Sequence, residues 1–110
     1  MRDAKADLLQ GTLDLLILQA LNAGPLHGWA ISKRIQLLSR NTLTANQGSL
    51  YPALYRLEDR GWISGTEVES PEGRRIKVYK QTAAGRRQLA REVEEWRTFS
   101  QAITLVLRTG

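Results

Sequence analysis

The chain has 110 residues, of which 16 are Lys or Arg and 11 are Asp or Glu, so its formal net charge is +5. A composition of 42% hydrophobic and 25% charged residues is that of one globular domain, and it excludes a disordered chain and a membrane protein. Cysteine is absent, which excludes disulfides, thiolate zinc sites, iron–sulfur clusters and cysteine nucleophiles. The longest apolar run, Leu15–Leu18, is too short to cross a bilayer. We therefore expect a cytoplasmic protein whose basic surplus favours an anionic partner, nucleic acid or lipid headgroups.

Two amphipathic segments predict a pair of antiparallel helices near the start of the chain. The first is expected from Thr12, acting as its cap, to Asn22, and Gly24-Pro25 ends it. Its buried face consists of Leu13, Leu16, Ile17 and Leu21. The second is expected over 28–38, with a basic outer side that carries Lys33 and Arg34. Its core side consists of Trp29, Ile31, Ile35 and Leu38.

The middle of the chain predicts a third helix and a hairpin. After a polar stretch over 39–46, in which Leu43 and Thr44 favour a short strand, a helix is expected to begin near Gly48 or Ser49 and to stop at Gly61. Its core stripe is Leu50, Leu54 and Leu57. Strands are expected over 62–69 and 74–81, around a charged turn at 70–73. Thr82 is then expected to cap a last helix from Ala83 to about Leu107.

This order of elements predicts a mainly α fold with a small β-hairpin: a winged helix-turn-helix unit over 1–82 and a long C-terminal dimerisation helix over 83–110. The major groove of DNA admits one α-helix, so a third helix that buries its leucines can present its other face to base edges and phosphates. That outer face is expected to carry Gly48, Ser49, Tyr51, Pro52 and Tyr55. Packing of either tyrosine against a neighbouring element is the alternative for these two side chains.

Basic residues follow the turn of the hairpin at Arg74, Arg75 and Lys77, where a wing would meet phosphates or the minor groove. The acidic residues Glu67, Glu69 and Glu72 lie in the same hairpin, so an internally balanced, solvated strand face is the alternative.

The segment Gly48–Glu58 (GSLYPALYRLE), followed by Gly61-Trp62-Ile63, resembles the recognition-helix signature of the PadR family of winged-helix transcriptional regulators. Leu26-His27-Gly28-Trp29 upstream, and Gly73-Arg74-Arg75, Tyr79, Thr82 and Gly85 downstream, extend the resemblance over about residues 8 to 107. Trp29 stands where the family more often has tyrosine, and Gln81 where it commonly has leucine, so packing near Gln81 is expected to be looser or more polar. The resemblance implies a homodimeric DNA-binding regulator, usually a repressor, whose repression is relieved by small molecules or stress signals. It also implies the short subgroup of the family, which includes multidrug-responsive repressors.

The last helix independently predicts a dimer. Apolar residues recur there at steps of four and three, a heptad seam in which Trp96 is central. The expected interface comprises Leu89, Val93, Trp96, Phe99, Ile103 and Leu107. A helix folded back on its own core is the alternative. We further expect Trp96 and its counterpart to line a pocket for a planar aromatic effector, unless this tryptophan only packs.

The sequence gives no sign of an enzyme, a cofactor or a metal site, because His27 is the single histidine and no phosphate-binding glycine loop is present. Capping or loop packing is the role expected for His27. The predicted partners are double-stranded DNA with an inverted-repeat operator and a second copy of the chain. No interaction with a membrane is predicted. The alternative function is a winged-helix protein-interaction module that lacks sequence-specific DNA binding.

Overall fold

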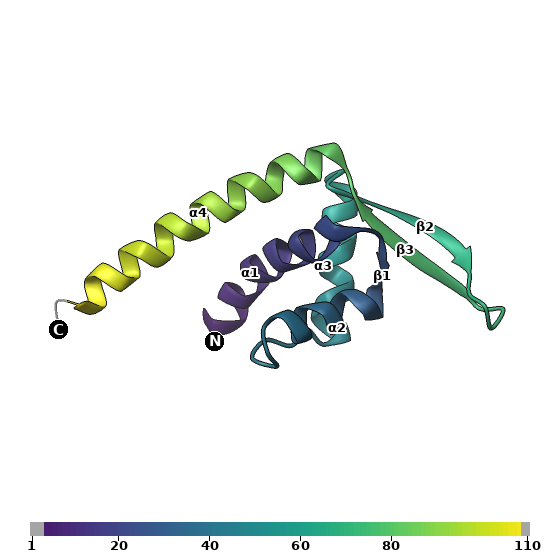
Figure 1. Ribbon diagram of the computed structural model, residues 1–110, viewed down its shortest axis with the longest axis horizontal. Helices are drawn as coiled ribbons and strands as arrows, with labels where there is room; N and C mark the ends of the chain where they lie inside the picture. The colour runs from purple at the N-terminus through teal and green to yellow at the C-terminus, as the bar shows by residue number, and fades with distance from the viewer. Residues whose placement is uncertain (1–3, 109–110) are drawn as a thin grey trace.

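The computed structural model describes residues 4–108, and the side chains from Gly11 to Arg108. Within these residues four helices and a small antiparallel sheet follow one another along the chain (Figure 1). The elements are α1 (Ala4–Ala20), the 3-10 turn η1 (Leu21–Ala23), β1 (Leu26–His27), α2 (Gly28–Leu38), α3 (Gln47–Asp59), β2 (Ile63–Glu69), β3 (Arg75–Gln81) and α4 (Ala83–Arg108). The predicted fold class, mainly α with a hairpin and a long last helix, is confirmed.

Several element ends lie where local chemistry predicts them. The Oδ1 atom of Asn46 accepts a hydrogen bond from the backbone N–H of Ser49 at 2.9 Å and caps α3. Gly61, with φ +77°, ends the same helix in the left-handed conformation that glycine tolerates best. Thr82 caps α4, because its Oγ1 accepts from the N–H of Gly85 at 3.0 Å. His27 is the N-cap of α2, and its Nδ1 accepts from the N–H of Ala30 at 3.3 Å.

Two other predictions of element position were wrong, and the predicted start of α3 was close. The first helix begins at Ala4, so Thr12 lies inside it and does not cap it. The prediction missed the earlier start because Ala4–Gly11 lacks the apolar periodicity that indicates a helix. No strand forms at Leu43 or Thr44; the short strand is instead β1. Helix α3 begins at Gln47, one residue before the earlier of the two predicted positions.

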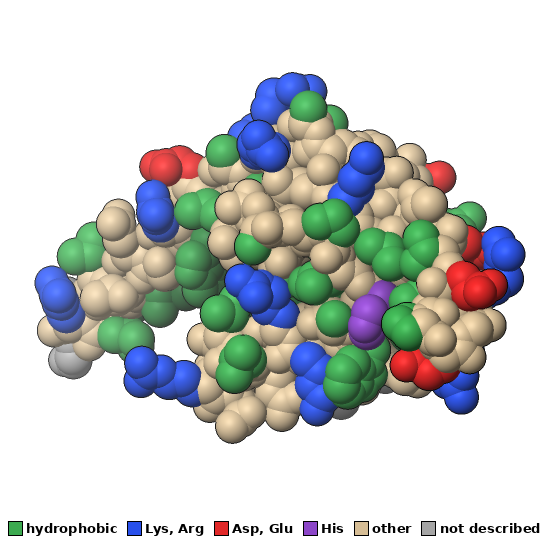
Figure 2. Space-filling model, turned by 45° about the vertical axis from the view of Figure 1, so that its right-hand side comes forward, with side chains coloured by type: hydrophobic (Ala, Val, Ile, Leu, Met, Phe, Trp, Pro, Cys, Tyr) green, Lys and Arg blue, Asp and Glu red, His purple; other side chains and the backbone are tan. Residues whose placement is uncertain are grey.

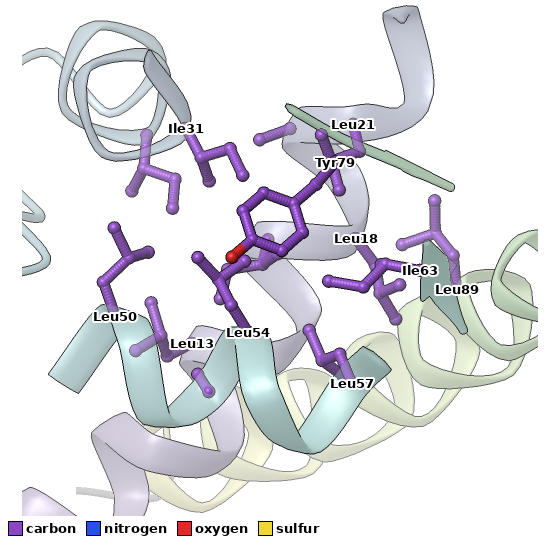
Figure 3. Close-up of a cluster of buried hydrophobic side chains, with 14 residues drawn as sticks. Leu13, Leu18, Leu21, Ile31, Leu50, Leu54, Leu57, Ile63, Tyr79 and Leu89 are labelled. Carbon is purple, nitrogen blue, oxygen red and sulfur yellow. The ribbon is translucent and has the colours of Figure 1, made fainter. Parts of the chain in front are cut away.

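The core lies between α1, α2, α3 and the sheet. Its buried members are Leu13, Ile17, Leu18, Ala20, Leu21, Ile31, Ile35, Leu50, Ala53, Leu54, Leu57, Ile63, Tyr79 and Leu89. In Figure 3 the ring of Tyr79, from β3, lies in the middle of the cluster, with Leu54 of α3 on one side and Ile31 of α2 on the other. The prediction that Trp29 and Leu38 face the core was wrong, because both are exposed and only Ile31 and Ile35 fill that side of α2.

The sheet has the strand order β1-β3-β2. Strand β2 pairs with β3 from Ile63↔Gln81 to Glu69↔Arg75, and β1 adds the pairs Leu26↔Tyr79 and His27↔Val78. We call β2, β3 and the turn between them the wing. The side-chain amide of Gln81 donates to the carbonyl of Leu18 at 2.9 Å, so the contact at this position is polar, as expected. Helix α4 extends away from the rest of the chain (Figure 1). With this helix included, the structure measures 57 × 29 × 29 Å along its principal axes.

Candidate nucleic-acid interface

Helix α3 has one buried and one exposed face. Leu50, Ala53, Leu54 and Leu57 are almost completely buried and fix the helix on the core. The predicted outer residues Gly48, Ser49, Tyr51, Pro52 and Tyr55 are all exposed. Pro52 lies in the second turn of the helix and supplies no N–H, so the carbonyl of Gly48 has no partner from the ordinary helical ladder. The exposed face therefore combines small residues and hydroxyl groups on a rigid support.

The two tyrosines differ in their surroundings. Tyr55 is 74% exposed, so its ring and hydroxyl are open to a partner. Tyr51 is 45% exposed, and its ring lies against the first residue of α2. A Cβ atom at Gly28 would come within 3.0 Å of the Tyr51 hydroxyl, so glycine is what allows this approach. Tyr51 thus packs against α2 and still leaves part of its surface on the outer face.

The basic residues of the wing are largely paired within the chain. Arg75 forms an ion pair with Glu67 across the hairpin at 2.9 Å. The ammonium of Lys77 lies 2.9 Å from Oε1 of Glu58 at the end of α3, and this hydrogen bond raises the pKa of Lys77. Arg74 is exposed at the turn, which Gly73 closes with φ +84°. The internally balanced strand face is therefore present in part, because two of the exposed cations have carboxylate neighbours. Contact of these cations with phosphates stays a prediction.

Sequence reasoning missed the partner of Arg56. Its guanidinium donates to Oδ1 of Asp14 on α1 at 2.8 Å, so it braces the recognition helix from behind. Burial raises the pKa of Asp14, while the hydrogen bond and charge of Arg56 lower it less strongly. Pairing across 42 residues of sequence leaves no local signal that could have identified it.

Sequence reasoning also missed the clearest charge asymmetry. No Asp or Glu occurs between Asp14 and Glu58, whereas Lys33, Arg34, Arg40 and Arg56 all lie in this interval. In the wing, by contrast, acids on β2 lie opposite cations on β3, with Glu67 in register with Lys77 and Glu69 with Arg75. Figure 2 shows acidic and basic side chains close together at the right-hand end of this face, and basic side chains among hydrophobic ones at its lower middle. A window count of charge along the chain, in place of the total, would have found this feature.

Helix α4 is anchored at its start and open along the rest. Leu89 is buried in the core of its own chain and Val93 packs beside it, so the prediction that Leu89 serves the dimer seam was wrong. Trp96, Phe99, Ile103 and Leu107 remain 42% to 74% exposed. The rings of Trp96 and Phe99 lie 6.1 Å apart at an interplanar angle of 46°. These side chains form one continuous apolar stripe, whereas the exposed apolar residues of a monomeric protein are usually scattered singly.

Between residues 4 and 108, no helix has the length and apolarity needed to span a membrane. The same residues contain no cluster of three His, Cys, Asp or Glu side chains suited to a metal ion.

The arrangement of α1, α2 and α3, with a hairpin beside the exposed face of α3, defines the winged helix-turn-helix class of fold. The model of the transcriptional regulator PadR-like family matches residues 17–91. The chain belongs to this family, whose members are DNA-binding regulators of transcription.

Solved structures agree with this assignment. The chain is 30% identical to a transcriptional regulator from Clostridium thermocellum, with a TM-score of 0.81 over 89% of this chain and 95% of that one. It is 27% identical to a PadR-like transcriptional regulator from Bacillus cereus, with a TM-score of 0.75 over 92% and 96% of the two chains. An uncharacterized protein X from Lysinibacillus sphaericus is 27% identical over 103 residues, 94% of each chain.

Proposed function

We propose that the protein is a homodimeric transcriptional repressor that binds an inverted-repeat operator through α3 and is released by a small-molecule effector. The observation that carries the proposal is the division of α3 into a leucine face held in the core and an exposed face of Gly48, Ser49, Tyr51, Pro52 and Tyr55. A helix held rigidly by one face is suited to the major groove, because its other side chains then reach base edges in a fixed register.

In this proposal each side chain of the exposed face has a distinct role. Gly48 lets the backbone approach the duplex closely, and the hydroxyl of Ser49 donates to a phosphate. Tyr51 and Tyr55 contact base edges with their rings and hydroxyls. Arg74, Arg75 and Lys77 approach the phosphates from the wing, where the duplex replaces Glu67 and Glu58 as the partner of Arg75 and Lys77.

Dimerisation is proposed to use the exposed stripe of α4 from Trp96 to Leu107. The helix has 26 residues and is therefore about 39 Å long, and its second half extends beyond the core of its own chain. A second copy would cover these apolar side chains, leaving 1–82 as the DNA-binding unit and 83–110 as the dimerisation unit. A two-fold dimer then places the two α3 helices in successive major grooves, with half-sites about 34 Å apart.

The effector site is proposed at Trp96. This indole and the ring of Phe99 lie together on the exposed stripe, and the partner's copies would add two more aromatic rings. Planar aromatic molecules bind such surfaces by stacking. Binding there would change the distance or tilt between the two α3 helices, so operator affinity would fall.

The proposal is tested by selecting DNA from a random pool with the purified protein and measuring affinity for the enriched duplex against bulk competitor DNA. Affinity should fall steeply with added salt while preference for the enriched sequence is retained. An interaction module without DNA specificity would enrich no sequence. Trp96→Ala, tested at a protein concentration at which sedimentation shows it to be dimeric, should lose the effect of a planar aromatic ligand on DNA affinity; an unchanged effect would refute the effector site.

A further inference from the structure

Three elements meet at the first turn of α2. His27 is in register with Val78 of β3, so this end of α2 is joined to the wing. Gly28 lies against the ring of Tyr51, so it also adjoins the outer face of α3. Trp29 follows directly in the same turn, and its ring contacts His27, the residue that pairs with the wing.

Trp29 is an exposed aromatic side chain held by its neighbours. It is 58% exposed although the sequence pattern predicts it in the core. Its ring stacks on His27 with centroids 6.2 Å apart at 15°, and the ammonium of Lys33 lies 5.2 Å from its centroid. These contacts order the indole without burying it. A restrained, exposed tryptophan beside a cation is suited to binding a partner, because little side-chain freedom remains to be lost.

The charge around this turn points to an anionic partner. Between Asp14 and Glu58 the chain has four cations and no carboxylate, so Lys33 has no acidic neighbour along its own helix. The wing differs, since Arg75 and Lys77 are both held by glutamates. Lys33 is exposed, and the contact that the structure gives its ammonium is the face of Trp29.

We propose that Trp29 and Lys33 together bind a backbone phosphate of the DNA beside the bases that α3 reads. The indole N–H donates one hydrogen bond and the ammonium supplies the charge. This inference rests on the proposed function and adds α2 to the DNA interface as an element that positions α3. Contacts of this kind fix register and carry no sequence information.

The test uses the full-length protein and a random-sequence DNA duplex, because a phosphate contact weakens binding to every sequence alike. The slope of log affinity against log salt concentration is negative, and Lys33→Gln should make it less steep by about 0.9 for each protomer bound. Its control is Lys80→Gln, which removes the same charge from an exposed position of β3. The control should leave the slope close to that of the unmodified protein.

Trp29→Phe keeps one aromatic ring for His27 and Lys33, and removes the N–H donor together with the second ring of the indole. Affinity for the same duplex should fall about tenfold, the loss expected for one hydrogen bond to a charged group. The control Leu37→Ala changes another exposed apolar side chain at the far end of α2 and should bind like the unmodified protein. Urea unfolding of each variant verifies that the fold is kept.

The proposal requires both effects. It is overturned if Lys33→Gln and Lys80→Gln change the salt slope equally, or if Trp29→Phe binds as tightly as the Leu37→Ala control. These failures are distinct from failure of the proposed function. In the latter case the unmodified protein would not bind the duplex, or Tyr55→Ala would leave preference for a selected sequence unchanged.

Discussion

Glu58 joins the end of α3 to both strands of the wing. Its Oε1 accepts a hydrogen bond from the ammonium of Lys77 on β3 at 2.9 Å, and its Oε2 accepts from the backbone N–H of Gly65 on β2 at 3.2 Å. One carboxylate therefore links the end of α3 to both strands of the wing and at the same time neutralises a cation of the wing.

Glu58→Gln should separate these two effects. The amide still accepts from Gly65 but no longer neutralises Lys77, so affinity for a random-sequence duplex should rise. The unfolding free energy should fall by at most about 1 kcal/mol, because the pair is partly exposed. Fluorescence anisotropy with a labelled duplex and urea unfolding measure the two quantities. An affinity equal to or below that of the unmodified protein would show that Lys77 stays engaged with α3 on DNA.

Gly85→Ala should be among the most damaging single methyl additions in the chain. A Cβ there would lie 1.9 Å from the carbonyl oxygen of Trp62, and backbone cannot move aside as a flexible side chain can. We expect a loss of about 3 kcal/mol in unfolding free energy, measured by urea titration. Gly11→Ala is the matched control, because Gly11 lies in α1 with no atom within 4 Å of its added Cβ. The control should stabilise the protein by about 0.5–1 kcal/mol, and equal effects of the two substitutions would contradict the prediction.

Asp14 gives stability a distinct pH dependence. Because burial raises its pKa above the ordinary value of 3.8, the native state binds the proton more tightly than the unfolded chain does. The contribution of Asp14 to the unfolding free energy is therefore fully present below pH 3.8, and it is lost as the pH rises through the pKa of Asp14 in the native state. Asp14→Asn does not titrate, so the stability of the unmodified protein minus that of the variant should fall across this window.

Urea unfolding over a pH series, at one protein concentration, measures this difference. Arg56→Met removes the larger of the two influences that lower the pKa of Asp14, the other being the charge of Arg60, so it should enlarge the loss of stability with rising pH. A difference that grows as the pH rises would mean that the ion pair outweighs burial.

Ile103→Glu should disrupt the proposed dimer. The substitution places a charge in the apolar stripe of α4, and burying an unpaired carboxylate against a second copy is costly. Gln101→Glu adds the same charge at an exposed position elsewhere on the helix. Sedimentation equilibrium should find a weakened dimer only for Ile103→Glu, with helicity unchanged. If both variants sediment like the unmodified protein, the stripe is not the interface.

The sequence predicted those features that depend on local chemistry. The leucine stripe of α3, the glycine stop at Gly61 and the threonine cap at Thr82 are short-range patterns, and the structure confirms them. The first half of α1 was missed because Gly11 and an irregular apolar pattern do not show helical periodicity. Strand β1 was missed because two residues are too few to show an alternation.

The candidate site was predictable only in its outline. The exposed face of α3 follows from helical spacing, because the leucines fix which side is buried. The pairing of Arg56 with Asp14 and of Lys77 with Glu58 depends on contacts across 42 and 19 residues, which spacing along one element does not report. Trp29 was placed in the core because hydrophobicity and helical period alone do not distinguish a core aromatic from an exposed one.

Photocrosslinking from position 55 tests the central proposal most directly. A photoreactive phenylalanine analogue replacing Tyr55 should crosslink to bases in both half-sites of the selected duplex, because that side chain points away from the core on α3. The same analogue at Thr98, an exposed position on α4, should give no crosslink to DNA. Crosslinking confined to position 98, or DNA binding without any crosslink from position 55, would contradict the assignment of α3 to the major groove.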